Sequence, residues 1–188
     1  MTVQLQANKA FYAQDIERLV QDHQVHRDVY TSQDVYALEM QHLFANVWVF
    51  VGHESQTPKH GDYFTTQVGS QPVIQVRHSD GGIKVLHNRC PHKGTKIAID
   101  RHGNTGTFFR CPYHAWSFET DGRLKAVPLE SGYSNTSFET TENANGIKPV
   151  GAVHNHRGFV FARLADSGIS FDNFFGDSLS SIDNMVDR

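Results

Sequence analysis

Two short segments constrain this chain more than any other feature of its sequence. Each combines a cysteine and a histidine with a proline: Cys90-Pro91-His92 in the first and Cys111-Pro112-Tyr113-His114 in the second. The chain has only these two cysteines, and 18 residues (93–110) separate the two segments. In a reducing compartment, such cysteines are better explained as metal ligands than as a disulfide. The fold therefore has to bring both segments to one metal centre.

The spacing of the four ligands distinguishes between kinds of metal site. Zinc fingers and ribbons usually group their cysteines in pairs that are two residues apart. Here each segment carries one thiolate and one imidazole, at different spacings. This arrangement suits a two-iron cluster in which Cys90 and Cys111 bind one iron while His92 and His114 bind the other. A structural zinc domain is an alternative, favoured if the protein is colourless and carries one zinc per chain.

Imidazole ligands change the charge of a two-iron cluster. A 2+ core with two thiolates is about neutral when oxidised and about −1 when reduced, roughly two units less negative than an all-cysteine cluster. Adding an electron is therefore easier, and the histidines allow reduction to couple to proton uptake. The motif predicts a Rieske-type 2Fe–2S centre that transfers single electrons.

The bulk composition fits a globular protein. The chain has 188 residues, of which 38% are hydrophobic and 20% charged, so a packed core is expected rather than disorder. A net charge of −3 without a basic block argues against nucleic acid as a partner. No apolar run approaches the ~18 residues of a membrane span, and the first residues lack a secretory pattern. We expect a cytoplasmic protein without a membrane partner.

Hydrophobic patterning divides the chain into three parts. Residues 1–46 are expected to form an N-terminal arm and a helix capped by Thr31, with Tyr36, Met40 and Leu43 on one face. Residues 47–165 contain short β-prone runs separated by turns at 79–82 and 120–123, which predicts a mainly β sandwich or barrel. Residues 166–188 are expected to be helical or irregular. The predicted strands span 47–53, 63–68, 73–78, 83–88, 107–110, 115–119, 124–127, 146–153 and 159–164.

The segments around the four ligands resemble a known family. Asn88-Arg89-Cys90-Pro91-His92-Lys93-Gly94 and Phe109-Arg110-Cys111-Pro112-Tyr113-His114-Ala115-Trp116-Ser117-Phe118 are similar to the cluster segments of aromatic ring-hydroxylating oxygenase α subunits. The resemblance runs from about Tyr30 to Leu164. Two positions depart from the common pattern, because the family usually has Arg where Lys93 stands and Gly where Ala115 stands.

The resemblance implies a fold and a set of cofactors. The expected fold is a Rieske-type antiparallel β-sandwich with two cluster-binding hairpin loops, preceded by an N-terminal helical segment. Cys90, His92, Cys111 and His114 would bind the 2Fe–2S cluster. A mononuclear Fe(II) is expected only in a separate catalytic domain, whose Asp-x2-His-x4-His pattern is nowhere in residues 1–188. We therefore expect a truncated α subunit or a fragment, inactive alone, with residues 166–188 beginning the linker to that domain.

The resemblance also implies partners and a reaction. A ferredoxin or reductase would supply electrons, and His92 or His114 would pass them to the catalytic domain of a neighbouring α subunit, with a β subunit as a further partner. The reaction would be hydroxylation or dihydroxylation of an aromatic substrate, and residues 53–56 look most like members that act on aromatic carboxylates. The alternative is a free-standing Rieske ferredoxin that only carries electrons, although such ferredoxins usually lack the segment Tyr30–Trp48.

Several positions around the ligands refine these expectations. Respiratory Rieske proteins have a second cysteine pair where Thr95 and Tyr113 stand, and a serine that bonds a cluster sulfur where Trp116 stands. Fewer hydrogen bonds to sulfur predict a potential at the low end of the Rieske range. The other histidine pair that invites attention, His154 and His156, is interpreted as part of a polar turn.

Overall fold

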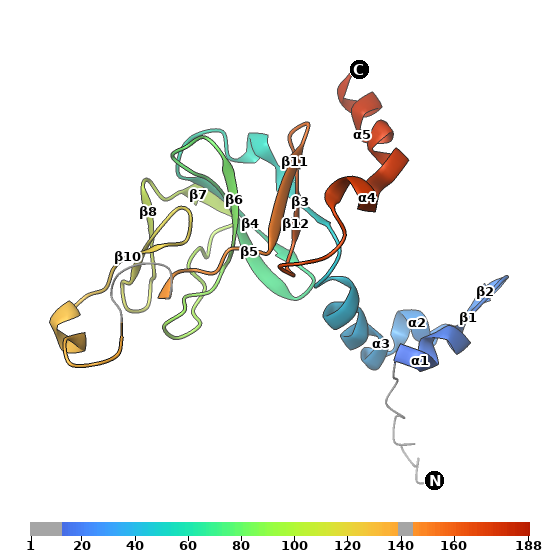
Figure 1. Ribbon diagram of the computed structural model, residues 1–188, viewed down its shortest axis with the longest axis horizontal. Coiled ribbons are helices and arrows are strands. Elements are labelled where there is room, and N and C mark those ends of the chain that lie inside the picture. Colours follow the sequence, from blue (N-terminus) through green and yellow to red (C-terminus); the bar gives the residue numbers. More distant parts are fainter. Residues whose placement is uncertain (1–12, 139–144) are drawn as a thin grey trace, which may run out of the picture.

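The computed structural model describes residues 13–138 and 145–188, which form mainly antiparallel β-structure (Figure 1). A four-stranded sheet has the order β6-β5-β4-β7, and two three-stranded sheets have the orders β11-β12-β3 and β10-β9-β8. The strands are β3 (Val49–His53), β4 (Asp62–Val68), β5 (Gln71–Arg77), β6 (Ile83–His87), β7 (His102–Asn104), β8 (Phe108–Arg110), β9 (Ser117–Glu119), β10 (Leu124–Ala126), β11 (Ala152–His156) and β12 (Phe159–Arg163). The expected mainly β, Rieske-type fold is confirmed.

Short helices lie at both ends of the chain. A two-stranded ribbon of β1 (Val20–Gln21) and β2 (Gln24–Val25) lies between the first helices. The helical elements are α1 (Ala13–Ile16), η1 (Glu17–Leu19), α2 (Asp28–Thr31), α3 (Gln33–Leu38), η2 (Glu39–Leu43), η3 (Glu54–Gln56), η4 (Glu130–Tyr133), α4 (Phe171–Phe175), η6 (Gly176–Ser178) and α5 (Leu179–Val186). Residues 1–12 of the expected N-terminal arm lie outside the described residues. Within the part that the structure describes, no helix is long and apolar enough to cross a membrane.

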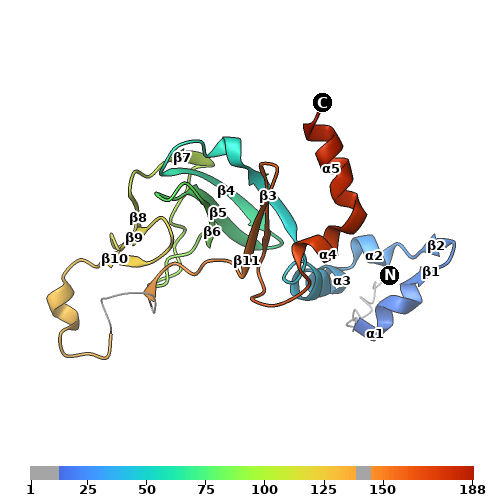
Figure 2. The ribbon, with the colours of Figure 1, turned by 45° about the horizontal axis from the view of Figure 1, so that its top comes forward.

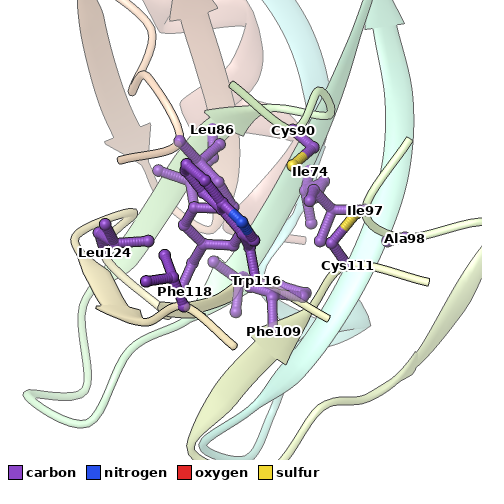
Figure 3. Close-up of a cluster of buried hydrophobic side chains, with 13 residues drawn as sticks. Ile74, Leu86, Cys90, Ile97, Ala98, Phe109, Cys111, Trp116, Phe118 and Leu124 are labelled. Carbon is purple, nitrogen blue, oxygen red and sulfur yellow. The ribbon is translucent and has the colours of Figure 1, made fainter. Parts of the chain in front are cut away.

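β5 is the centre of the packing because both of its faces are covered. Side chains alternate between the two faces of a strand. Val73 points into a core shared with β3 and β12, whereas Ile74 and Val76 point into a core shared with β8, β9 and the two cysteines. Figure 3 shows this second core, in which the aromatic rings of Trp116 and Phe118 lie beside Leu86.

The structure corrects four sequence expectations. Ser32, not Thr31, caps the main N-terminal helix, because Thr31 ends a separate short turn and the Ser32 hydroxyl accepts the Val35 amide proton. Val35 is the buried residue of this helix, while Tyr36 and Leu43 are about half exposed.

Two of the corrections concern strands. β7 was missed because His102-Gly103-Asn104 has no apolar alternation, and its pairing with β4 holds it in place. The strand expected over 146–153 begins only at Ala152, since only residues 148–150 run along β6, through isolated hydrogen bonds on either side of Pro149.

The last correction concerns His154 and His156, which lie in β11 rather than in a turn. His154 stacks on Phe171 with ring centroids 3.8 Å apart, and His156 Nε2 lies 2.8 Å from Asp183 Oδ1 in α5. The turn falls instead at Arg157 and Gly158, both with positive φ.

Trp48 connects the start of the β-structure to the C-terminal helices. Its ring packs edge-on against Phe171 at 5.5 Å, and its indole nitrogen donates to the carbonyl of Ile169. The buried Arg163 lies over the same ring and also donates to Ile169. Both views place α4 and α5 on the side of the molecule away from β8 and β10 (Figure 2).

Replacing Trp48 by Ala should lower the free energy of unfolding by about 3–5 kcal/mol, the usual cost of removing a buried aromatic side chain. Chemical denaturation followed by circular dichroism measures the change. Trp48→Phe, which retains most of the packing and loses only the hydrogen bond, should cost much less. Equal losses in both variants would contradict the proposed packing role.

Candidate metal centre

The two sequence motifs occupy two loops at one edge of the core. The first connects β6 to β7, which are opposite edges of the four-stranded sheet, and the second is the tip of the β8–β9 hairpin. Cys90 and Cys111 are 2% and 3% exposed, and both thiols are free. Figure 3 shows them on the same side of the core, next to Ile97. The structure thus brings together two cysteines that are 21 positions apart.

The first loop turns tightly around its cysteine. The amide of Cys90 donates to the carbonyl of Thr95 (2.8 Å), and the amide of Gly94 donates back to the carbonyl of Cys90 (2.9 Å). Gly94 has φ of +75°, a left-handed conformation that glycine adopts without strain. The loop needs this residue to reverse direction within five positions.

The second loop repeats the same turn with a different residue at the reversal. Cys111 donates to the carbonyl of Trp116 (2.8 Å), and Ala115 donates back to Cys111 (3.0 Å). Ala115 has φ of +57°, a conformation that costs a residue with a Cβ roughly 1–2 kcal/mol. This position is where the sequence departs from the glycine of the family pattern, so the departure places strain in a ligand loop.

Asn88 holds the first loop against the body of the domain. It is 3% exposed, and its side-chain oxygen accepts the amides of Ile97 (2.8 Å) and Ala98 (3.0 Å). Its side-chain nitrogen donates to the carbonyl of Ala98 at 2.7 Å. One buried amide group therefore closes both ends of the loop that carries Cys90 and His92. Sequence reasoning missed this role, although a polar residue between a buried strand and a ligand loop is a usable signal.

The two histidines meet on the outer side of the cysteines. The rings of His92 and His114 are 4.7 Å apart and nearly perpendicular. Trp116 stacks flat on His92 at 4.8 Å, and Tyr113 stacks on His114 at 3.7 Å. His114 is exposed, whereas the ring of His92 is partly covered. The imidazole pair therefore forms the solvent-facing edge of the centre.

The electrostatic environment favours the neutral forms of Cys90 and His92. Burial, and then the adjacent Cys111 thiol, raise the pKa of Cys90, while the backbone amides of His92 and Lys93 donate to the Cys90 sulfur and oppose that rise. Desolvation, followed by the charges of His114 and Lys93, lowers the pKa of His92. A neutral imidazole has a free lone pair, which is the form that binds metal.

The residues present fit a Rieske cluster. Nδ1 of His92 is buried and has no hydrogen-bond partner among the described residues. Buried polar atoms rarely stay unpaired, so an unsatisfied imidazole nitrogen beside a second imidazole and two thiols is a position that a metal would complete. In residues 13–138 and 145–188, no group of three or more His, Cys, Asp or Glu side chains is placed to hold one metal ion. The contacts between Cys90 and Cys111 and between His92 and His114 match the two ligand pairs of a Rieske two-iron cluster.

Comparison with known proteins decides the family. The model of the Rieske [2Fe-2S] domain matches residues 47–140, half of the chain. The chain belongs to the Rieske [2Fe-2S] domain family. This assignment supports a Rieske-type 2Fe–2S cluster as the cofactor, and it confirms the resemblance drawn from the two ligand segments.

The relatives within this family are oxygenase subunits. The chain is 33% identical to the benzene 1,2-dioxygenase subunit alpha of Pseudomonas putida, over 100% of this chain and 41% of the relative. It is 37% identical to the glycine betaine monooxygenase oxygenase subunit of Chromohalobacter salexigens, over 88% of this chain and 35% of the relative. The chain thus spans about two fifths of the length of these relatives, and corresponds to their Rieske portion.

A solved structure has the same fold. Naphthalene 1,2-dioxygenase from Rhodococcus sp. superimposes with a TM-score of 0.83 and 27% identity, covering 93% of this chain and 39% of that chain. The similarity therefore includes most of the described elements on both sides of the Rieske match.

Replacing Asn88 by Ala should leave two amides and one carbonyl of the first loop unpaired. We expect the free energy of unfolding to fall by about 1–3 kcal/mol and the iron content per chain to fall with it. Asn88→Asp, which retains the acceptor and loses the donor, should be intermediate. Iron analysis and thermal denaturation measure the two effects. Full iron content in Asn88→Ala would contradict the proposed role of Asn88 in holding the first loop.

The two reversal positions should respond in opposite directions. Ala115→Gly relieves a left-handed alanine and should raise the free energy of unfolding by up to about 1 kcal/mol. Gly94→Ala should lower the free energy of unfolding by about 1–2 kcal/mol. The alanine would have to adopt a positive φ, and its Cβ would lie 3.2 Å from Nε of Arg89. Denaturation midpoints of the two variants, measured side by side, test the pair. A shift of the same sign in both would show that φ is not the cause.

Proposed function

We propose that Cys90, His92, Cys111 and His114 bind the 2Fe–2S cluster and that the chain is the electron-transfer domain of a ring-hydroxylating oxygenase α subunit. When bound, a Rieske cluster supplies reversible one-electron chemistry, with potentials of about −150 to +300 mV. The observation that carries the proposal is the division of the site into two pairs, with buried thiols next to each other and an imidazole pair at the surface.

Each part of the chain has a task in this proposal. The two loops hold the buried cysteine thiolates away from water, and Trp116 and Tyr113 hold the two imidazoles by stacking. The exposed His114 gives electrons a short route into or out of the domain. We propose a ferredoxin or reductase as the donor and the mononuclear iron of a neighbouring α subunit's catalytic domain as the acceptor. The chain alone would then be an oxidoreductase component without oxygenase activity.

The surface beside the imidazoles supports contact with another folded domain. A shallow pocket of about 350 Å³ is lined by both histidines together with Leu129 and Tyr133. Leu129 is 85% exposed and Tyr113 is 63% exposed. Large apolar side chains exposed around a redox centre suit a stable subunit interface. We assign this surface to the neighbouring catalytic domain, and a β subunit remains a further proposed partner.

The alternative is a free-standing Rieske ferredoxin. The alignment with the dioxygenase subunit runs over the whole chain, well outside residues 47–140, which supports the oxygenase. We therefore propose the division expected from the sequence, with 1–46 as an arm and helix, 47–165 as the Rieske domain and 166–188 as the start of a linker. A reading frame that continues past Arg188 into Asp-x2-His-x4-His would agree; a stop codon there would favour the ferredoxin.

The proposed substrate is aromatic, by similarity to dioxygenases, and the proposed location is the cytoplasm. An aromatic carboxylate stays part of the proposal, and the segment that suggested it, residues 53–56, also has a structural task. His53 caps η3, since its ring accepts the amide of Ser55 and the side chain of Gln56 accepts the amide of His53. The glycine betaine relative shows by its name that Rieske subunits of this type are not confined to aromatic compounds.

Electron paramagnetic resonance of the anaerobically purified, dithionite-reduced protein tests the cluster. We expect a rhombic signal with an average g value below that of all-cysteine ferredoxins. Cys111→Ser should abolish it by removing a ligand, whereas Ser55→Ala, which is far from the ligands in sequence, should leave it unchanged. A zinc-containing, iron-free protein would overturn the proposal.

The charge of the ligand set should control the potential. His92→Cys adds one negative charge to the cluster, so the potential should fall if a cluster assembles. A redox titration followed by visible absorption measures the change. A potential that is unchanged in a fully loaded variant would exclude His92 as a ligand.

A further inference from the structure

We propose that a positively charged groove beside the Cys90 loop is the docking surface for an acidic electron-donor protein of the ferredoxin type. The inference rests on the proposed function and adds the surface and charge of its partner. The groove has a volume of about 830 Å³ and runs between the first ligand loop and residues 146–148. Its cations are Arg89, Lys93, Lys96 and Lys148.

The groove is positive in a chain whose net charge is −3. The four cationic side chains are exposed, and the residues that line the groove in the described part of the chain include no Asp or Glu. None of the four forms an ion pair with any residue in 13–138 or 145–188. The cations that are paired to carboxylates lie elsewhere: Arg18, Arg27, Lys84, Arg123, Lys125 and Arg157. The groove therefore offers charge that residues 13–138 and 145–188 do not neutralise.

Hydrogen bonds fix the backbone that carries Lys96 and Lys148. The carbonyl of Lys148 accepts the amide of His87 in β6, and Asn88 binds the residues directly after Lys96. Burial, and then the charge of Lys148, lower the pKa of His87, so this residue adds no positive charge at neutral pH. The groove's charge therefore comes from the arginine and the three lysines.

The position of the groove suits electron delivery. Cys90 and His92 line it, so a partner bound there lies directly against the first ligand loop. The cations are exposed and come from two separate segments rather than converging as buried donors, which suits an extended acidic surface better than one small anion. Exposed charge speeds encounter and loses effect in salt, as expected for a short-lived complex.

The two faces of the centre therefore differ in chemistry. Leu129, Tyr113 and Tyr133 surround the imidazole side with apolar and aromatic groups, while the Cys90 side is basic. The apolar side suits a permanent neighbour and the basic side suits a transient donor, and His92 lines both pockets.

The test measures electron transfer from a plant-type 2Fe–2S ferredoxin, an acidic probe that is reduced and then freed of reductant. Its reduction potential lies below that of Rieske centres, so electron transfer to the cluster is favourable. The cluster-loaded chain is mixed with the probe in a stopped-flow instrument at several ionic strengths. For the unmodified chain, we expect a second-order rate constant that falls steeply as salt increases.

The decisive variant is Lys96→Glu combined with Lys148→Glu, which reverses one charge on each of the two segments and leaves Arg89 and Lys93, the cations next to the ligands in sequence, unchanged. We expect the rate at low salt to fall about tenfold or more, and its salt dependence to flatten or reverse. The matched control is Arg18→Glu combined with Arg27→Glu, which changes net charge equally at η1 and α2, at the other end of the molecule (Figure 1). This control should retain nearly the full rate.

Failure of the inference is distinguishable from failure of the proposed function. Paramagnetic resonance and direct reduction by dithionite are measured for every variant first. A normal cluster with equal rates in the groove variant and the control would overturn the docking surface alone. An unmodified chain without a Rieske signal would overturn the proposed function and this inference with it.

Discussion

The rest of this structure depends on one constraint, that two loops distant in sequence have to meet at one site. Cys90 and Cys111 have to meet inside a hydrophobic core, although one loop crosses the four-stranded sheet and the other ends a hairpin. Both loops use the same turn. The cysteine forms backbone hydrogen bonds with residues four and five positions later, and the residue four positions later has a positive φ. The core can then close around the thiols instead of around solvated backbone.

The spacing within each motif separates the buried ligands from the accessible ones. Because Cys90 and Cys111 are held inward, the histidines two and three positions later project past them and meet at the surface. Stacking by Trp116 and Tyr113 restricts the imidazoles without using their nitrogens. A centre of this kind keeps its thiolates dry, which favours a defined potential, and still leaves a histidine edge for a partner.

The sequence predicted the features that depend on local pattern. Alternating apolar residues located most strands, and the hairpin turns at 79–82 and 120–123 connect β5 to β6 and β9 to β10. The paired Cys and His segments located the residues that meet. Features that depend on distant contacts were missed: β7 is polar and exists through its pairing with β4, and His154 belongs to a strand because it pairs with Phe161 in β12. The role of Asn88 was also missed, because its three side-chain hydrogen bonds reach residues 97 and 98 across the loop.

The same separation explains why charge and apolar surface lie on different sides of one centre. The exterior of the Cys90 loop has to stay polar for two reasons. The loop backbone turns within a few residues, and the neighbouring segment 146–148 is already hydrogen-bonded to β6. Lysine and arginine fulfil that need and repel each other, so the arrangement costs stability that a purely structural loop would not require. The η4 side bears no such cost and exposes Leu129 instead. Among the described residues, six cations outside the groove form an ion pair with a carboxylate, whereas the four cations of the groove form none.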